Sequence, residues 1–147
     1  ELAVKLCKKL DCVGVLAVEM FLKGNQVLVN ELAPRPHNSG HYTIEACVTS
    51  QFQQHIRSIF NLALGDTKHA GTAIMLNIVG DNGYEGKVKY ENLDKVFISK
   101  NANLHIYGKE QTRPNRKMGH VTIICDKFEE AYETAKFLKD SIKVKSE

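Results

Sequence analysis

The sequence has no long apolar run and no strong net charge. None of its apolar stretches approaches the ~20 residues of a membrane-spanning helix. Its first ten residues, ELAVKLCKKL, contain neither the long apolar region nor the cleavage site of a secretory signal. The net charge of +3 is too small to indicate a partner. We therefore expect no membrane association and a cytoplasmic location.

The sequence also has no C-x-x-C pair among its four cysteines, Cys7, Cys12, Cys47 and Cys125. Their apolar neighbours favour reduced, packed thiols over a disulfide framework or a zinc site. With 147 residues, 43% of them apolar and 25% charged, the chain resembles a globular protein with one core, or with one core and a small satellite.

Two glutamates stand out in the segment between residues 19 and 41. Strands are predicted at 13–22 and 26–33, and each carries one carboxylate among apolar neighbours: Glu19 in VLAVEMF and Glu31 in VLVNEL. Such a carboxylate must be paired, bound to metal or hydrated. Two of them suggest a cation between.

The length of the hairpin loop decides whether these glutamates meet. A two-residue loop, Gly24-Asn25, would place Glu19 opposite Asn30, whereas a three-residue loop including Gln26 would place Glu19 opposite Glu31. Opposed carboxylates suit a hard ion such as Mg²⁺. In the alternative, one glutamate simply points to solvent.

A polar loop at 34–41 follows, and a basic loop lies further along. The first gathers side chains able to bind an anion or move a proton, namely Arg35, His37, Asn38, Ser39 and His41, and its prolines limit the entropy lost on binding. The second gathers Lys109, Arg113, Arg116, Lys117 and His120. The four Lys and Arg side chains of this loop repel one another, and an anion would relieve that repulsion.

The remaining pattern alternates helices with strands. Apolar spacing predicts helices at residues 1–10, from Ser50 to Gly65 and from Phe128 to Leu138 with Asp126 as cap. Thr43 and Ser50 are both candidate helix caps. Strands are predicted at 71–80, 103–107 and 120–125. Residues 91–99 are ambiguous, and the terminal KVKSE should fray. A turn at Asp81-Asn82-Gly83 suggests a boundary.

Three segments together carry a family resemblance: VEMF, the run NELAPRPHNSGHYTIEACVTSQFQQHIRSI, and YGKEQTRPNRKMGHVTI. They resemble the 5-(carboxyamino)imidazole ribonucleotide synthetases, ATP-dependent carboxylases of purine biosynthesis in the ATP-grasp superfamily. The resemblance spans nearly the whole chain and is closest to fungal forms, in which a mutase domain is fused. It implies an α+β fold: the carboxy-terminal part of an ATP-grasp domain at 1–80, with mainly antiparallel sheet and flanking helices, and a small β-rich lobe at 81–147.

The resemblance also assigns roles to individual residues. Glu19 and Glu31 correspond to magnesium ligands, with Asn30 beside Glu31 near the ATP phosphates. Arg35, His37, Asn38 and Ser39 correspond to the segment facing bicarbonate and aminoimidazole ribonucleotide, with Arg35 and His37 catalytic. Lys109, Arg116 and Lys117 correspond to the groups holding the 5′-phosphate.

The same resemblance implies that this sequence is a carboxy-terminal part, inactive alone, of an enzyme that forms a homodimer and binds no nucleic acid. In the implied reaction, ATP converts bicarbonate to carboxyphosphate, whose breakdown delivers CO₂ to the ribonucleotide amine. Two alternatives remain open. The basic loop at 109–117 could serve a non-catalytic anion- or nucleic-acid-binding module, or the chain could be purely structural.

Overall fold

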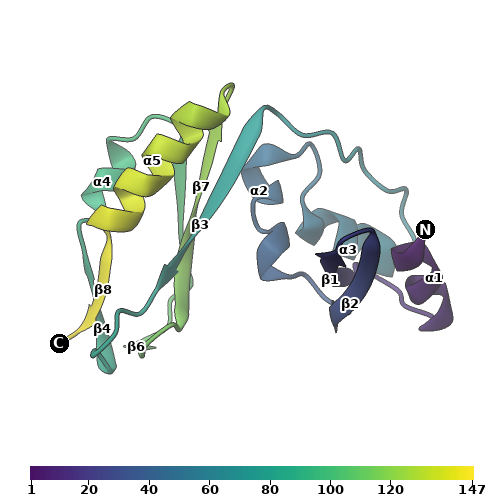
Figure 1. Ribbon diagram of the computed structural model, residues 1–147, viewed down its shortest axis with the longest axis horizontal. Coiled ribbons are helices and arrows are strands. Elements are labelled where there is room, and N and C mark those ends of the chain that lie inside the picture. The colour runs from purple at the N-terminus through teal and green to yellow at the C-terminus, as the bar shows by residue number, and fades with distance from the viewer. The chain divides into compact units, whose positions relative to one another are not determined.

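The computed structural model describes all 147 residues, which form two compact units, Glu1–His69 and Ala70–Glu147. Figure 1 shows helices and strands in both. The strands pair antiparallel throughout, so the predicted α+β class is confirmed. The two units divide between His69 and Ala70. The strand at 72–79 pairs along its whole length with a strand of the second unit and therefore belongs to it.

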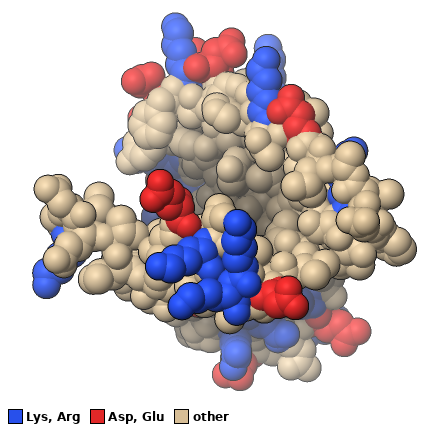
Figure 2. Space-filling view, turned by 90° about the vertical axis from the view of Figure 1, so that its right-hand side faces the viewer, with Lys and Arg blue, Asp and Glu red and all other residues tan.

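The first unit begins with helix α1 (Leu2–Lys9), followed by the hairpin of β1 (Ala17–Lys23) and β2 (Gln26–Ala33). The helix confirms the amphipathic pattern, and its three lysines are exposed. Figure 2 views the side of the molecule that carries α1 and shows Lys and Arg side chains gathered there.

A 3₁₀ turn, η1 (Asn38–Gly40), and two helices, α2 (Thr43–Ala46) and α3 (Gln51–Ile59), complete the first unit. Ser50 caps α3 as predicted, in a capping box with Gln53. The helix ends at Ile59, well before the expected Gly65, because Asn61 takes a left-handed backbone conformation at φ 52°.

The second unit is built on the antiparallel sheet β3–β7–β5, formed by β3 (Thr72–Val79), β7 (Lys117–Cys125) and β5 (Ala102–Ile106). Helix α5 (Phe128–Ser141) packs across β3 and β7 (Figure 1). The predicted strands are confirmed, although β7 begins at Lys117, before the expected His120. The ambiguous stretch contains the short helix α4 (Asp94–Phe97).

A second small sheet, in the order β6–β4–β8, consists of β6 (Gln111–Thr112), β4 (Gly86–Glu91) and β8 (Lys143–Ser146). The expectation of a frayed tail was therefore wrong. Val144 is 1% exposed, and β8 pairs with β4 over four residues. The buried side chain of Val144 and the pairing with β4 stabilise β8, although its lysines had suggested a chain end exposed to solvent.

The hydrophobic core lies entirely in the second unit. Its buried members include Val96, Met118, Ile123, Leu138 and Val144. In the first unit only Ala33, Ala46, Thr49 and Ser50 are buried. Two alanines supply too little apolar surface for a core, so the described part of the first unit has no hydrophobic core of its own.

Candidate functional site

The two hairpin glutamates lie opposite one another. The loop has two residues, since Lys23 pairs with Gln26, and Gly24 adopts φ 58° within it. A two-residue loop was predicted to place Glu19 opposite Asn30, but the structure does not have this pairing. An irregularity in β2 sets Met20 against Val29 and Glu19 against Glu31, which leaves Asn30 as the extra residue.

The imidazole of His37 lies close to both carboxylates. Its Nε2 is 3.6 Å from Oε1 of Glu19 and 3.9 Å from Oε1 of Glu31. Asn30 completes the group, with Nδ2 donating to Oε2 of Glu19 at 3.5 Å. The side chain of His37 is 13% exposed, whereas those of Glu19 and Glu31 are 40% and 54% exposed. A largely covered imidazole thus faces two partly exposed carboxylates.

The neighbouring loop orients the His37 ring. Its Nδ1 accepts from the backbone N–H of Ser39 at 3.4 Å and lies 2.9 Å from the Ser39 hydroxyl. When Nδ1 is the acceptor, the ring proton sits on Nε2 and points at the carboxylates. In that tautomer His37 presents a donor toward the glutamates, and the contacts with Ser39 favour it.

Gln51 at the start of α3 holds the same loop and was missed by sequence reasoning. Its Oε1 accepts from the backbone N–H of His37 at 2.9 Å, and its Nε2 donates to the His37 carbonyl at 2.8 Å. The amide also lies 2.8 Å from Nδ1 of His41. A Cβ at Gly40 would come within 2.5 Å of Oε1 of Gln51. The glycine of the PRPHNSGH segment therefore makes room for this support.

Arg35 and Asn38 lie in the same loop as His37. The guanidinium of Arg35 is exposed and donates to the carbonyl of Pro36 at 3.0 Å. Asn38 opens η1. Of the predicted loop residues, the structure thus brings His37 beside both glutamates, with Ser39 hydrogen-bonded to His37, while the exposed guanidinium of Arg35 can turn toward a ligand.

The donor chemistry of the glutamate group suits a hard divalent cation. Mg²⁺ takes carboxylate and carbonyl oxygens, keeps several waters and uses one or two carboxylates with substrate phosphates. Glu19, Glu31 and the amide oxygen of Asn30 offer that set. No three His, Cys, Asp or Glu side chains of the chain are arranged to hold a metal by themselves. A metal here would therefore need oxygens from a ligand or from water.

The basic loop of the second unit has a defined geometry. Lys109 Nζ donates to the carbonyl of Lys117 at 2.5 Å, and Arg116 donates from its guanidinium to the carbonyl of Gln111 at 3.0 Å. Asn115 adopts a φ of 62°, and its backbone N–H donates to the carbonyl of Gly80 at 2.9 Å. Two cationic side chains are thus fixed on backbone carbonyls, whereas Arg113 and Lys117 are exposed.

Electrostatics make this loop receptive to an anion. Partial burial lowers the pKa of Lys109, and the nearby charges of Arg116 and Lys117 lower it further. An anion bound among these groups would offset the repulsion from Arg116 and Lys117 and would stabilise the charged form of Lys109. His120, predicted as part of this cluster, is instead buried within β7 and stacks on His105 of β5. His120 lies inside the strand and not in the loop because β7 begins at Lys117, before the predicted start at His120.

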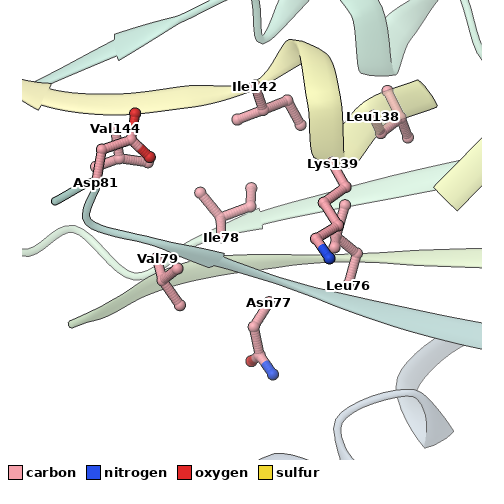
Figure 3. A pocket seen from close by; sticks show the side chains of 9 residues that line it. All are labelled: Leu76, Asn77, Ile78, Val79, Asp81, Leu138, Lys139, Ile142 and Val144. Carbon is pink, nitrogen blue, oxygen red and sulfur yellow. The ribbon is translucent and has the colours of Figure 1, made fainter. Parts of the chain in front are cut away.

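A separate cavity of about 210 Å³ lies between β3, α5 and β8. Figure 3 shows its largely apolar wall, with Lys139 and Asp81 among the few charged side chains. None of the predicted site residues lines it. No helix in the chain meets the length and hydropathy of a membrane span.

Comparison with known proteins gives a consistent result. Residues 1–52 match the ATP-grasp domain family, and residues 73–134 match the family described as the phosphoribosylaminoimidazole carboxylase C-terminal domain. The N5-carboxyaminoimidazole ribonucleotide synthase of Bacillus subtilis is 51% identical over 125 residues, which are 84% of this chain and 31% of that protein. The phosphoribosylaminoimidazole carboxylase of Saccharomyces cerevisiae is 41% identical over 143 residues, 93% of this chain and 25% of that protein.

Solved structures agree with these relatives. The N5-carboxyaminoimidazole ribonucleotide synthetase of Thermotoga maritima has a TM-score of 0.92 at 51% identity, covering 99% of this chain and 41% of that one. The N5-carboxyaminoimidazole synthase of Aspergillus clavatus, in complex with ADP and 5-aminoimidazole ribonucleotide, has a TM-score of 0.72 at 37% identity. The match covers 86% of this chain and 34% of that one. The chain spans about a third of the length of the curated bacterial relatives it matches.

Proposed function

Because the chain belongs to the N5-carboxyaminoimidazole ribonucleotide synthase family of ATP-grasp proteins, we propose that it carries metal-binding and substrate-binding parts of that carboxylase. The proposed overall reaction converts 5-aminoimidazole ribonucleotide, bicarbonate and ATP to 5-(carboxyamino)imidazole ribonucleotide, ADP and phosphate. The observation that carries this proposal is the opposed pair Glu19 and Glu31 with His37 beside it, on the loop that bears the family motif.

In the proposed reaction a bicarbonate oxygen attacks the γ-phosphorus of ATP, and ADP leaves with the electrons of the broken P–O bond. Carboxyphosphate then breaks down to CO₂ and phosphate, and the ribonucleotide amine bonds to CO₂ and loses a proton. Mg²⁺, when bound, neutralises phosphate charge during phosphoryl transfer. Glu19 and Glu31 would hold it, with Asn30 next to the phosphates.

His37 and Arg35 would act at the carboxylation step. Nε2 of His37 faces carboxylates in this structure, and when protonated it would donate to a carboxylate-like ligand, bicarbonate, in the same way. The exposed guanidinium of Arg35 donates to the carbonyl of Pro36, so it can move to carboxyphosphate without breaking an ion pair. Asn38 and Ser39 would add oriented hydrogen bonds from the same loop.

Lys109 and Arg116, with Lys117 at the loop edge, would hold the 5′-phosphate of the ribonucleotide. Both cations are already fixed by backbone carbonyls, so binding costs little additional side-chain freedom. Binding energy from this phosphate, distant from the chemistry, would hold the amine where CO₂ is released. We further propose a cytoplasmic homodimer, with a fused mutase domain in fungal-type forms.

Arg116→Ala in the complete protein tests the phosphate site. We expect the apparent KM for the ribonucleotide to rise by about ten- to a hundredfold with the KM for ATP little changed, because one charge-assisted bond to phosphate is lost. Arg57→Ala on α3 is the matched control, because the Arg57 guanidinium likewise donates to a backbone carbonyl, that of Ala63, at 3.0 Å. Loss of ATP binding in Arg116→Ala would contradict the assignment. Salt-sensitive binding of single-stranded nucleic acid through this loop would support the alternative module.

A further inference from the structure

Tyr107 connects the interior of the second unit to the basic loop. We propose that Tyr107, held by His120, is a positioning residue that keeps the ammonium group of Lys109 ready to receive a phosphate monoester. This inference rests on the proposed role of Lys109 and deepens it. It concerns how the site is assembled before a ligand arrives.

The first step is the anchoring of Tyr107. His105 and His120 are register partners in β5 and β7, and their rings stack with centroids 4.4 Å apart and planes 10° apart. The hydroxyl of Tyr107 lies 2.9 Å from Nδ1 of His120. The backbone N–H of Tyr107 donates to the carbonyl of Met118 at 3.0 Å. Tyr107 is thus held through both its backbone and its side-chain tip, which determines the plane of its ring.

The second step leads from Tyr107 to Lys109. Gly108 between them adopts φ 67°, a left-handed conformation that turns the chain back and that other residues rarely adopt. Nζ of Lys109 then lies 5.6 Å from the centroid of the Tyr107 ring. This distance is within the ~6 Å over which an aromatic face attracts a cation. The contact with the ring offsets part of the repulsion that the Lys109 ammonium meets from the charges of Arg116 and Lys117.

The third step concerns the hydrogen bonds left for a ligand. One N–H of the Lys109 ammonium goes to the carbonyl of Lys117. An ammonium has three donors, so two stay available for phosphate oxygens. Arg116 is fixed in a comparable way by Gln111. The ring of Tyr107 and the carbonyl of Lys117 therefore define the position of Lys109 before binding, and less rotamer freedom is lost when phosphate binds.

A double-mutant cycle, read by calorimetric titration of the complete protein with ribose 5-phosphate, tests this. Tyr107→Leu should weaken binding about two- to fivefold, the range expected for one cation–aromatic contact. Tyr107→Phe keeps the ring but loses the bond to His120, so its loss should be smaller. Lys109→Ala should weaken binding about ten- to a hundredfold. Tyr107→Leu should have no additional effect in the Lys109→Ala background. Tyr132→Leu, at an exposed tyrosine of α5, is the matched control.

The outcomes separate the two hypotheses. If Lys109→Ala binds ribose 5-phosphate normally, the phosphate anchor itself fails. If Lys109→Ala weakens binding but Tyr107→Leu adds its full effect on top, Tyr107 does not act through Lys109 and the positioning role is overturned. Should Tyr107→Leu not fold, NMR of the unmodified protein decides. The Lys109 ε-methylene should show a ring-current shift, and a shift typical of a free lysine would overturn the proposal.

Discussion

Glu19 faces Glu31 across the hairpin because β2 contains one residue more than β1 between the loop and the pair. Two carboxylates directly opposite one another are separated by roughly 5 Å between Cβ atoms and repel. The irregular register is therefore unfavourable unless a cation or a hydrogen-bond donor lies near the two carboxylates. In this structure the imidazole of His37 lies there. A cation placed between them would make the same geometry favourable.

Glu31→Gln tests that geometry. In the complete protein we expect ATP turnover to fall about a hundredfold or more, since even outer partners of metal ligands cost 10- to 100-fold. Binding of the ribonucleotide should be nearly unchanged, because its phosphate is held elsewhere. Steady-state kinetics and equilibrium binding measure the two quantities. Glu85→Gln, at an exposed glutamate of the second unit, is the control. Normal turnover in Glu31→Gln would remove this residue from the metal site.

The lowered pKa of Lys109 predicts an alkaline limit for phosphate binding. As the pH rises through that lowered pKa, Lys109 loses its charge while Arg116 keeps its own. The affinity for phosphate should therefore begin to fall at a pH below 10.5, the ordinary pKa of lysine. Bound phosphate should raise the pKa and cause proton uptake in this range. Calorimetry in buffers of different ionisation enthalpy measures that uptake. Lys109→Arg should bind without it, and equal uptake in that variant would contradict the prediction.

The ion pair of β4 and β8 predicts how stability depends on pH. Hydrogen bonding and charge from Lys145, 2.8 Å away, lower the pKa of Glu91, and Glu91 raises that of Lys145. The pair therefore makes its full contribution to the free energy of unfolding between pH 4.5, the ordinary pKa of Glu91, and pH 10.5, the ordinary pKa of Lys145. It is lost as the pH falls through the lowered pKa of Glu91 or rises through the raised pKa of Lys145.

Glu91→Gln should therefore lower the free energy of unfolding at pH 7 and have much less effect at pH 2. Chemical denaturation at both pH values measures this. Glu133→Gln, at an exposed position of α5, should change little at either. An equal effect of Glu91→Gln at both pH values would show that packing, and not charge, is responsible.

Val144→Ala tests the packing of the terminal strand. The side chain is 1% exposed and belongs to the core of the second unit, so removing two carbon atoms should cost about 2 kcal/mol of unfolding free energy. Val4→Ala at a 58% exposed position of α1 should cost much less. Thermal or chemical denaturation followed by circular dichroism measures both. A negligible effect at Val144 would mean that β8 contributes nothing to the fold.

Much of the fold was predictable from local patterns. Periodicity located α1, α3, α5 and the main strands, and Ser50 was correctly identified as a cap, because these features depend on neighbours within a few residues. The tail at 143–147 was misjudged. Its strand depends on pairing with β4, more than fifty residues earlier, and no local signal reports that pairing.

The sequence by itself determined which chemical groups this protein carries: two hairpin carboxylates, a histidine loop and a basic loop, recognisable from residue types in order along the chain. Only the tertiary structure decided how they are arranged. The glutamates meet through a register irregularity, although the loop has the length that should have separated them. Gln51 and Tyr107 became visible as supports through contacts at their side-chain tips. Hydrogen-bond geometry between distant residues is set by packing, which leaves no periodic trace in the sequence.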